Sequence, residues 1–508
     1  MAEPLHVRNK ISKQAEMKPG RSHIILFSVI TIGVILFTFI FIKAYISSFT
    51  HDESFSYLNY CNESFMEIIS YSNWYTNNHI LNSLFMKYSE KLFGSSEIAL
   101  RLPNLLLLIL YMVYSYLLFK DTNSFLTVAM FTLMCTNCAL MDLFGLARGY
   151  GMSCGFMLMS LYHFIRYFKD PGITNLALFH AGSLMACLSN FTMLTYYVAI
   201  MIVFNLIVFM NSKFVKGVKY RFFKSNMVHI VPLTIVIIVL FEPVRRVITY
   251  NTLNFGGSTG FYADTITHLI YNVFHGISLP SFAISILQII FTSLVLISLF
   301  IVILMMIKRN KSFFEEHTGL ITSCFLLILI SVIIIALHVF FKADYPISRF
   351  SIFLFPVFMV HIGFLVHYLM SLKYEKLILA VISIIALASM INFWQNTSLR
   401  SSIEWAYDTN TKDMIQTLVS HRKKNNPGTG NVRLGINRLF EPTINFYRET
   451  MGIEWLKPVD DKGISKNDDY CYMFNYELNQ LDSSEYEVIK KYSNINTMLI
   501  MNIKVPDK

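Results

Sequence analysis

The chain has 508 residues, of which 54% are hydrophobic and only 15% are charged. Soluble globular domains carry about 25% charged residues. The composition therefore argues against two or three soluble domains, and it also excludes a disordered chain, a collagen-like repeat and a disulfide-stapled secreted scaffold. It is typical of a polytopic membrane protein, in which a net charge of +10 is explained by basic residues in cytoplasmic loops rather than by nucleic-acid binding.

Apolar segments follow one another between residues 24 and 394. A helix needs about 20 predominantly apolar residues to cross the hydrocarbon core of a bilayer. On this criterion we predict about eleven transmembrane helices, preceded by a tail of residues 1–23. The predicted spans are 24–42, 102–119, 124–141, 150–165, 174–189, 192–210, 228–241, 282–307, 318–341, 350–371 and 377–394.

Basic residues occur at every second connection between these spans. They are Arg8, Lys10, Lys13, Lys18 and Arg21 in the tail, then Lys120, Arg166, Lys169, Lys213, Lys216, Lys219, Arg221, Lys224, Lys308, Arg309, Lys311, Lys373 and Lys376. Cytoplasmic loops are enriched in Lys and Arg, so this pattern predicts a cytoplasmic N-terminus. Because the cations are spread over six segments, they form no single surface for nucleic acid.

This topology predicts three polar regions on the opposite, extracytoplasmic face: a first loop at 43–100, a middle loop at 242–276 and the tail 395–508. The middle loop contains a glycine-rich stretch at 254–260, which is either a turn between interfacial helices or a segment that orders over a substrate. In the tail, charged residues return and short apolar strands are predicted at 432–436, 470–474 and 498–505. The predicted fold class is thus an α-helical polytopic membrane protein with a small C-terminal soluble α/β domain, which serves as a platform for an acceptor or as a lid.

The strongest local signal is the tripeptide His51-Asp52-Glu53, directly after the first span. Two adjacent carboxylates at a membrane surface are costly to desolvate, and membrane insertion does not require them. A carboxylate fixed at the mouth of a lipid-facing cavity can take a proton from an acceptor hydroxyl. The alternative is an ordinary solvated start of a loop.

Three further features share this predicted face. The first loop contains the run at 77–82 and the run LFGSSEIALRLPN at 92–104, with an amphipathic segment 83–92 that suits a helix lying on the bilayer surface. Asp142 and the run Arg148-Gly149-Tyr150-Gly151 lie between the third and fourth spans. Arg349 begins the tenth span, which contains Pro356.

Together, these motifs resemble the GT-C glycosyltransferases, especially the branch that holds the protein O-mannosyltransferases and the lipid A aminoarabinose transferase. The resemblance covers residues 24–200 well and is patchy to 394; many relatives have His-Pro-Pro where this chain has His79-Ile80-Leu81. It implies a GT-C type integral membrane enzyme that moves a sugar from a polyprenyl-phosphate-linked donor to a protein, lipid or glycan acceptor outside the cytoplasmic membrane. It further implies that Asp52 is the catalytic base, that Glu53 supports it and that Asp142 is a second catalytic acid.

Breaking a sugar–phosphate bond builds negative charge on the departing polyprenyl phosphate. Arginines hold phosphate through forked hydrogen bonds, so Arg101, Arg148 and Arg349 are candidate donor phosphate-binding residues; contact with a lipid headgroup is the alternative for Arg101. His79, Asn82 and Tyr150 are candidate substrate-binding residues, with a purely structural histidine as the alternative for His79. The chemistry requires no activated water, so we expect no cofactor, although a divalent metal held by His51, Asp52 and His79 stays open.

Two other functions remain alternatives. A transporter or flippase for a lipid-linked sugar usually has ionisable residues near the bilayer midplane and two related halves; here the mid-span ionisable residues are few and no second half repeats the first. An O-antigen polymerase or ligase is not expected to carry an acidic pair directly after its first span. The lack of a long hydrophilic insert favours a bacterial inner membrane as the location.

Overall fold

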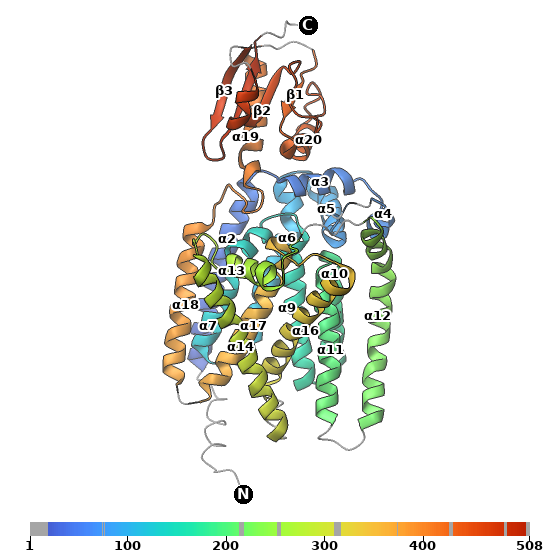
Figure 1. Ribbon diagram of the computed structural model, residues 1–508, viewed down its shortest axis with the longest axis vertical. Helices are drawn as coiled ribbons and strands as arrows, with labels where there is room; N and C mark the ends of the chain where they lie inside the picture. The colour runs from blue at the N-terminus through green and yellow to red at the C-terminus, as the bar shows by residue number, and fades with distance from the viewer. Residues whose placement is uncertain are drawn as a thin grey trace.

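We describe a computed structural model of the chain in residues 19–73, 75, 77–212, 218–250, 256–308, 316–372, 374–425, 430–481 and 485–503. It consists of a long helical body with a small unit built on a sheet at one end, and the chain ends in that unit (Figure 1). The chain is an α-helical polytopic membrane protein with a small C-terminal α/β unit, as the sequence predicts.

The helical body contains helices of very different lengths. They are α2 Pro19–Ile46, α3 His51–Tyr60, α4 Phe65–Ser70, α5 Ile80–Phe93, α6 Glu97–Phe119, α7 Ser124–Cys135, α8 Cys138–Phe144, α9 Gly149–Lys169, α10 Ile173–Ser189, α11 Met193–Ser212, α12 Val218–Thr249, the π-helix η1 Tyr262–Ile266, α13 Thr267–Val273, α14 Ser281–Lys308, α16 Thr318–Phe341, the 3₁₀ turn η2 Ser348–Ser351, α17 Leu354–Met370 and α18 Glu375–Asn396.

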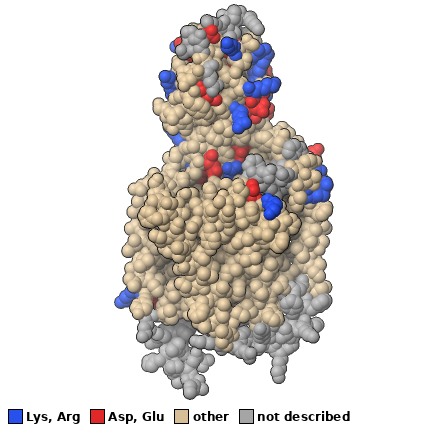
Figure 2. Space-filling model, in the orientation of Figure 1, with Lys and Arg blue, Asp and Glu red and all other residues tan. Residues whose placement is uncertain are grey.

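Seven helices of the described residues are long and apolar enough to cross a membrane, namely those at 23–46 (in α2), 97–119 (α6), 193–210 (in α11), 281–307 (in α14), 318–341 (α16), 348–370 (η2 with α17) and 375–396 (α18). Large apolar side chains on the outside of the body are exposed, such as Phe27, Ile307 and Phe340 at 71–77% exposure. An exposed apolar surface on helices of this length is typical of a surface that faces lipid. Figure 2 shows the body almost free of charged atoms on the visible face, whereas charges gather on the C-terminal unit and at its junction with the body.

Several of the predicted spans do not meet the length and hydropathy criterion as single helices. The third predicted span, 124–141, is two helices, α7 and α8, bent by 67°. Asn137 ends the apolar run between them, because its side-chain oxygen accepts a hydrogen bond from Leu140 N at 2.9 Å and so caps α8. The fourth, fifth and seventh predicted spans are the helices α9, α10 and α12. α10 has only 17 residues, and α9 and α12 carry basic residues near their ends. Among the described residues, seven or eight helices meet the length and hydropathy criterion, whereas the sequence predicts about eleven spans.

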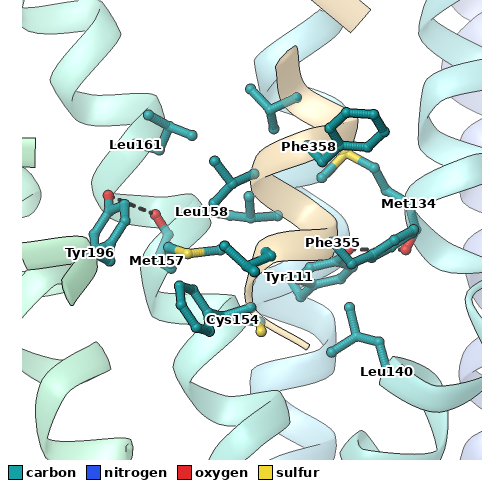
Figure 3. Packing of buried hydrophobic residues seen from close by; sticks show 14 of the residues in the cluster. Tyr111, Met134, Leu140, Cys154, Met157, Leu158, Leu161, Tyr196, Phe355 and Phe358 are labelled. Carbon is teal, nitrogen blue, oxygen red and sulfur yellow. Dashed lines mark hydrogen bonds between the residues drawn. The ribbon is translucent and has the colours of Figure 1, made fainter. Parts of the chain in front are cut away.

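The main core lies between α6, α7, α9, α11 and α17 (Figure 3). Tyr111 and Tyr196 are fully buried there among Met, Leu and Phe side chains. Their hydroxyl groups donate to Met134 O at 2.9 Å and to Ser160 Oγ at 2.9 Å. A buried hydroxyl without a partner costs free energy, so these two bonds allow tyrosine to serve as a core residue.

The C-terminal unit is a mixed four-stranded sheet with helices. Its elements are η3 Ala406–Asn410, α19 Thr411–Asn425, β1 Leu434–Ile436, η4 Arg438–Phe440, α20 Glu441–Thr450, β2 Tyr470–Phe474, η5 Asn475–Gln480, β3 Tyr486–Tyr492 and β4 Thr497–Asn502. The strand order is β1-β2-β4-β3, with β1 parallel to β2 and the other pairs antiparallel. The three predicted strands correspond to β1, β2 and β4, although residues 504–505 lie outside the described residues; β3 was not predicted.

The C-terminal unit is docked on the helical body above α3 (Figure 1). The ring of Phe49 stacks on that of Phe446 with 4.3 Å between centroids. Phe49 N donates to Tyr447 Oη at 2.7 Å, and Tyr447 Oη donates to Glu97 Oε1 at 3.0 Å. Lys43, at the end of α2, also donates to the Ser398 and Ser401 carbonyls, both at 2.7 Å. The two parts of the molecule therefore share a continuous interface at the segment that precedes α3.

Candidate functional site

The acidic pair lies in the first turn of α3. Thr50 is the N-cap residue of this helix, and Glu53 Oε2 accepts hydrogen bonds from Thr50 N at 2.9 Å and Thr50 Oγ1 at 3.0 Å. An acidic side chain at this position satisfies backbone donors that the helix leaves unpaired and interacts favourably with the helix dipole. The sequence Thr-His-Asp-Glu therefore starts a helix shortly after the C-terminal end of α2, rather than a solvated loop.

Glu53 is fully buried and paired with Arg101, which is also fully buried. Arg101 Nε donates to Glu53 Oε1 at 2.8 Å and Nη2 donates to Glu53 Oε2 at 2.7 Å. The remaining guanidinium hydrogens are taken by the Ala44, Ser47 and Ser48 carbonyls at 2.8–3.0 Å. All three guanidinium nitrogens of Arg101 thus donate hydrogen bonds to groups inside the protein. Arg101 therefore joins α2, α3 and α6.

Asp52 has a different environment from its neighbour. Its carboxylate is 15% exposed and lies between two arginines, with Asp52 Oδ2 at 3.3 Å from Arg148 Nη2 and at 3.5 Å from Arg349 Nη2. Arg148 is 1% exposed, whereas Arg349 is 23% exposed. The structure therefore brings together three of the candidate residues, from segments far apart in the chain, at the end of the helical body that carries the C-terminal unit.

Arg148 is the N-cap residue of α9 and is held by the first loop. Its Nη1 donates to Ser56 Oγ at 2.8 Å and to Asp52 O at 3.2 Å, and its Nη2 donates to Asn77 Oδ1. Asn77 in turn donates from Nδ2 to Asp52 O at 3.1 Å. Asn77 thus links the Asp52 backbone to the Arg148 guanidinium, a role that its position in a polar loop did not reveal.

Gly149 explains why a glycine follows Arg148. A Cβ atom at this position would lie 1.8 Å from Ser189 O and 2.8 Å from His79 Cγ. The start of α9 can therefore pass between the end of α10 and the His79 ring only without a side chain. This close packing fixes the direction in which the neighbouring Arg148 extends toward Asp52.

Arg349 lies in η2, just before α17, and is surrounded by groups from the segment that follows α18. Its Nη1 donates to Glu404 Oε2 at 3.2 Å, and its guanidinium carbon lies 4.8 Å from the centre of the Trp405 ring. Ser348 has the uncommon φ of 47° and donates from its hydroxyl to Glu404. Glu404 and Trp405 were not predicted; they lie in a polar connection in which no local pattern distinguishes them.

The three candidate substrate-binding residues are buried around these arginines. Tyr150 Oη accepts from Arg349 Nε at 3.2 Å, and the Tyr150 ring lies 4.8 Å from that of His79. Asn82 donates to Ala147 O at 2.9 Å and accepts from Asn104 Nδ2 at 2.9 Å, so it holds the backbone next to Arg148. Asn82 is 2% exposed, and in these contacts it supports the backbone beside Arg148.

His79 is an uncharged histidine in this setting. Burial lowers its pKa well below 6.5, and the positive charges of Arg148 and Arg349 lower it further. A hydrogen bond to the Ser189 carbonyl acts in the opposite direction. The ring therefore carries no charge at neutral pH and adds none to the two guanidinium groups beside it.

Asp142, the second candidate acid, is 1% exposed and paired with Lys43 Nζ at 2.6 Å. Its other oxygen accepts from Ser402 Oγ at 3.0 Å and from Ile403 N at 2.9 Å. It lines a small recess together with Asn272, Arg349 and Glu404. Asp142 thus fixes the segment that carries Glu404, and its carboxylate is already used by these partners.

The glycine-rich stretch of the middle loop is anchored close to Arg349. Gly257 and Tyr345 exchange two backbone hydrogen bonds of 2.8 and 2.9 Å, and Gly256 N donates to Asp344 at 3.2 Å. Asp264 accepts from Thr259 N and Gly260 N at 2.8 and 2.9 Å. Residues 254–255 lie outside the described residues, but from Gly256 onward the stretch is a bonded turn before η1.

The predicted amphipathic segment 83–92 is the helix α5. Its polar face does not point to water, however, because Lys87 is 9% exposed and donates to Cys61 O at 2.7 Å. Tyr57, on α3, donates from its hydroxyl to Glu90 on the same face. The helix therefore packs Lys87 and Glu90 against α3 and the residue that follows it. Tyr88, Lys91, Leu92 and Phe93 are exposed.

No group of three or more His, Cys, Asp or Glu residues in the described part of the chain is arranged to hold a metal ion. One residue of the metal set considered from the sequence, His51, has another partner. His51 Nδ1 lies 2.9 Å from Leu439 O.

Fold and site together define a polytopic membrane protein. At one end of its helical body, the partly exposed carboxylate of Asp52 lies between two guanidinium groups. No protein-family model and no curated protein sequence matches the chain. Among solved structures, the chain is similar to ArnT from Cupriavidus metallidurans. The apo form matches with 12% identity and a TM-score of 0.42 over 95% of this chain and 99% of that one. The form bound to undecaprenyl phosphate matches with 12% identity and a TM-score of 0.43 over 94% and 98%.

The chain is also similar to the archaeal oligosaccharyltransferase AglB from Archaeoglobus fulgidus, solved with an inhibitory peptide and a dolichol-phosphate. That match has 11% identity and a TM-score of 0.43, and it covers 89% of this chain and 70% of that chain.

Proposed function

We propose that this protein is a membrane glycosyltransferase that moves a sugar from a polyprenyl-phosphate-linked donor to a hydroxyl of a protein, lipid or glycan acceptor on the extracytoplasmic face. The observation that carries the proposal is the position of Asp52: a partly exposed carboxylate between Arg148 and Arg349, at 3.3 and 3.5 Å. The reaction needs a base and a cationic group for the departing phosphate at one place.

In the proposed reaction the acceptor oxygen attacks the anomeric carbon of the donor sugar. A bond forms between these two atoms, and the acceptor proton goes to the Asp52 carboxylate. The bond between the anomeric carbon and the phosphate oxygen breaks, and its electron pair leaves with the polyprenyl phosphate. Guanidinium groups beside that oxygen stabilise the charge as it develops, and the apolar surface of the helical body suits the polyprenyl chain.

The two arginines have different parts in this proposal. Arg148 is buried and bonded to Ser56 and Asn77 as well as to Asp52, so it is suited to fix the base. Arg349 is more exposed and divides its guanidinium between Asp52 and Glu404. A phosphate that takes hydrogen bonds from Arg349 draws it away from Asp52, and the carboxylate is then free to accept a proton.

The first experiment replaces Asp52 with Asn, which keeps the size of the side chain and removes the basic oxygen. The variant is expected to lose transfer by roughly 100-fold or more, the usual contribution of a general base. The measurement is mass spectrometry of envelope glycans and glycoproteins in a strain that lacks the gene and carries either form. Asp121→Asn is the matched control, because Asp121 is 63% exposed and paired with Arg166 in the connection between α6 and α7.

Full transfer by Asp52→Asn at normal expression would refute the proposed base. A purified protein that moves labelled lipid-linked sugar across liposomes, without transferring the sugar to any acceptor, would replace the enzyme by a flippase.

A further inference from the structure

The C-terminal unit contacts the helical body most closely at the residues that lead into Asp52. Three successive backbone N–H groups precede the acidic residue, and each has a side-chain acceptor. Phe49 N donates to Tyr447 Oη at 2.7 Å, Thr50 N donates to Glu53 at 2.9 Å, and His51 N donates to Asp408 Oδ2 at 2.7 Å. Two of these three acceptors belong to the C-terminal unit.

Asp408 is the acceptor nearest to the proposed base. It is 1% exposed, and its second oxygen accepts from Thr411 Oγ1 at 3.2 Å. Its first oxygen, Oδ2, accepts from His51 N, which is the first N–H of α3. A helix leaves this N–H without a partner of its own. The His51 ring gives the same residue a second link, because its Nδ1 lies 2.9 Å from Leu439 O in η4. His51 is therefore held through both its backbone and its side chain.

We propose that Asp408 is a positioning residue for Asp52: by binding the first N–H of α3, the C-terminal unit sets the place of the proposed base between Arg148 and Arg349. The inference rests on the proposed function, because it takes Asp52 as the base. The hydrogen bond between His51 N and Asp408 is independent of that function. The C-terminal unit then completes the site, in contrast to a separate acceptor platform or a lid that opens and closes.

The chemistry of Asp408 fits a fixed helix cap. A carboxylate at a helix N-terminus interacts favourably with the helix dipole. A buried one is tolerated only when its oxygens have hydrogen-bond partners, and Asp408 has partners on both. Asparagine offers an oxygen acceptor for His51 N at the same position, so it is a close substitute.

Two variants test the contact in the full-length protein. Asp408→Leu fills a similar volume and removes the acceptor, whereas Asp408→Asn keeps an oxygen for His51 N–H. Asp408→Leu is expected to lower kcat by roughly 100-fold, as when a reacting group is displaced by about 1 Å, with little change in the affinity for added polyprenyl phosphate. Asp408→Asn is expected to retain most of the wild-type activity. Amide hydrogen exchange at residues 49–53 should be faster in Asp408→Leu and unchanged in Asp408→Asn.

Lys412→Met is the matched control for docking. Lys412 Nζ pairs with Glu97 at 2.7 Å across the same interface, so this variant weakens docking without touching His51 N. It should keep both kcat and the exchange rate at residues 49–53. Equal losses in Lys412→Met and Asp408→Leu would overturn the proposal, as would unchanged exchange in Asp408→Leu or a defect in Asp408→Asn as large as in Asp408→Leu.

The exchange measurement separates this inference from the proposed function. If wild type transfers no sugar, the exchange rates still decide whether Asp408 fixes the start of α3. If Asp408→Leu does not accumulate, Asp408→Ser, whose hydroxyl is too short to reach His51 N, takes its place with the same expected results.

Discussion

At the residue scale, two neighbouring carboxylates have opposite environments. Consecutive residues on a helix point in directions about 100° apart. Glu53 therefore points into the protein against Arg101, while Asp52 points toward the more open side, where Arg148 and Arg349 lie. The buried pair holds the turn in place, and the turn presents the partly exposed carboxylate.

Replacing Arg101 with Met should destabilise the whole protein. The change leaves Glu53 buried without its cation and removes the link to the Ala44, Ser47 and Ser48 carbonyls. Breaking one side of a buried ion pair costs about 3–5 kcal/mol, so the unfolding temperature of the detergent-solubilised protein should fall by several degrees or more.

Arg245→Met is the comparison for this variant. Arg245 pairs with Glu242 at 2.7 Å but is 55% exposed, and an exposed pair contributes at most about 1 kcal/mol. Equal changes in unfolding temperature for the two variants would contradict the role of Arg101 as an internal link.

The sequence identifies some of the clustered residues and misses others for a physical reason. Asp52, Arg148 and Arg349 are ionisable residues beside apolar segments, where such residues are rare and costly. Asn77 and Glu404 lie in polar segments, where they resemble their neighbours. Asp408 is 357 residues from the backbone group that it binds, so only the tertiary structure reveals its contact.

At the element scale, hydropathy predicts that the apolar segments are helices but does not predict where they break. A hydropathy window averages over 124–141 and gives one span, whereas the side chain of Asn137 begins a new helix and turns the chain. The strand β3 was missed for a related reason. It pairs only with β4, at the edge of the sheet, and carries Lys490 and Lys491; charged residues are typical of edge strands and hide the apolar alternation.

The start of α9 offers a sharp test of packing. In Gly149→Ala, the new Cβ would meet Ser189 O at 1.8 Å, so either α9 or α10 must move and carry Arg148 with it. We expect a lower unfolding temperature and, in the same preparation, a loss of transfer larger than the loss of folded protein.

Gly172→Ala serves as the control, because Gly172 has open space around its Cβ position at the start of α10. This variant should change neither the unfolding temperature nor the transfer activity. A Gly149→Ala protein with the stability of wild type would show that the helices adapt at this point, and the close packing would then have no role in placing Arg148.

At the scale of the whole molecule, the site is made where distant segments meet at one end of the helical body. The first loop, the start of α9, the start of α17 and the connection after α18 each contribute a charged group. Ends of helices are the parts of a membrane protein where charges are tolerated, because they lie near water. The proposed reaction therefore depends on which side of the membrane this end faces.

The orientation can be measured by thiol labelling with little background. All seven native cysteines are buried, so a membrane-impermeant maleimide should react mainly with an introduced cysteine. Lys462 in the C-terminal unit is 83% exposed, and Asp121 between α6 and α7 is 63% exposed. We expect Lys462→Cys to react in intact cells and Asp121→Cys to react only after permeabilisation, because the basic connections stay in the cytoplasm. The reverse pattern would place Asp52 on the cytoplasmic side, and an extracytoplasmic transfer by this site would then be impossible.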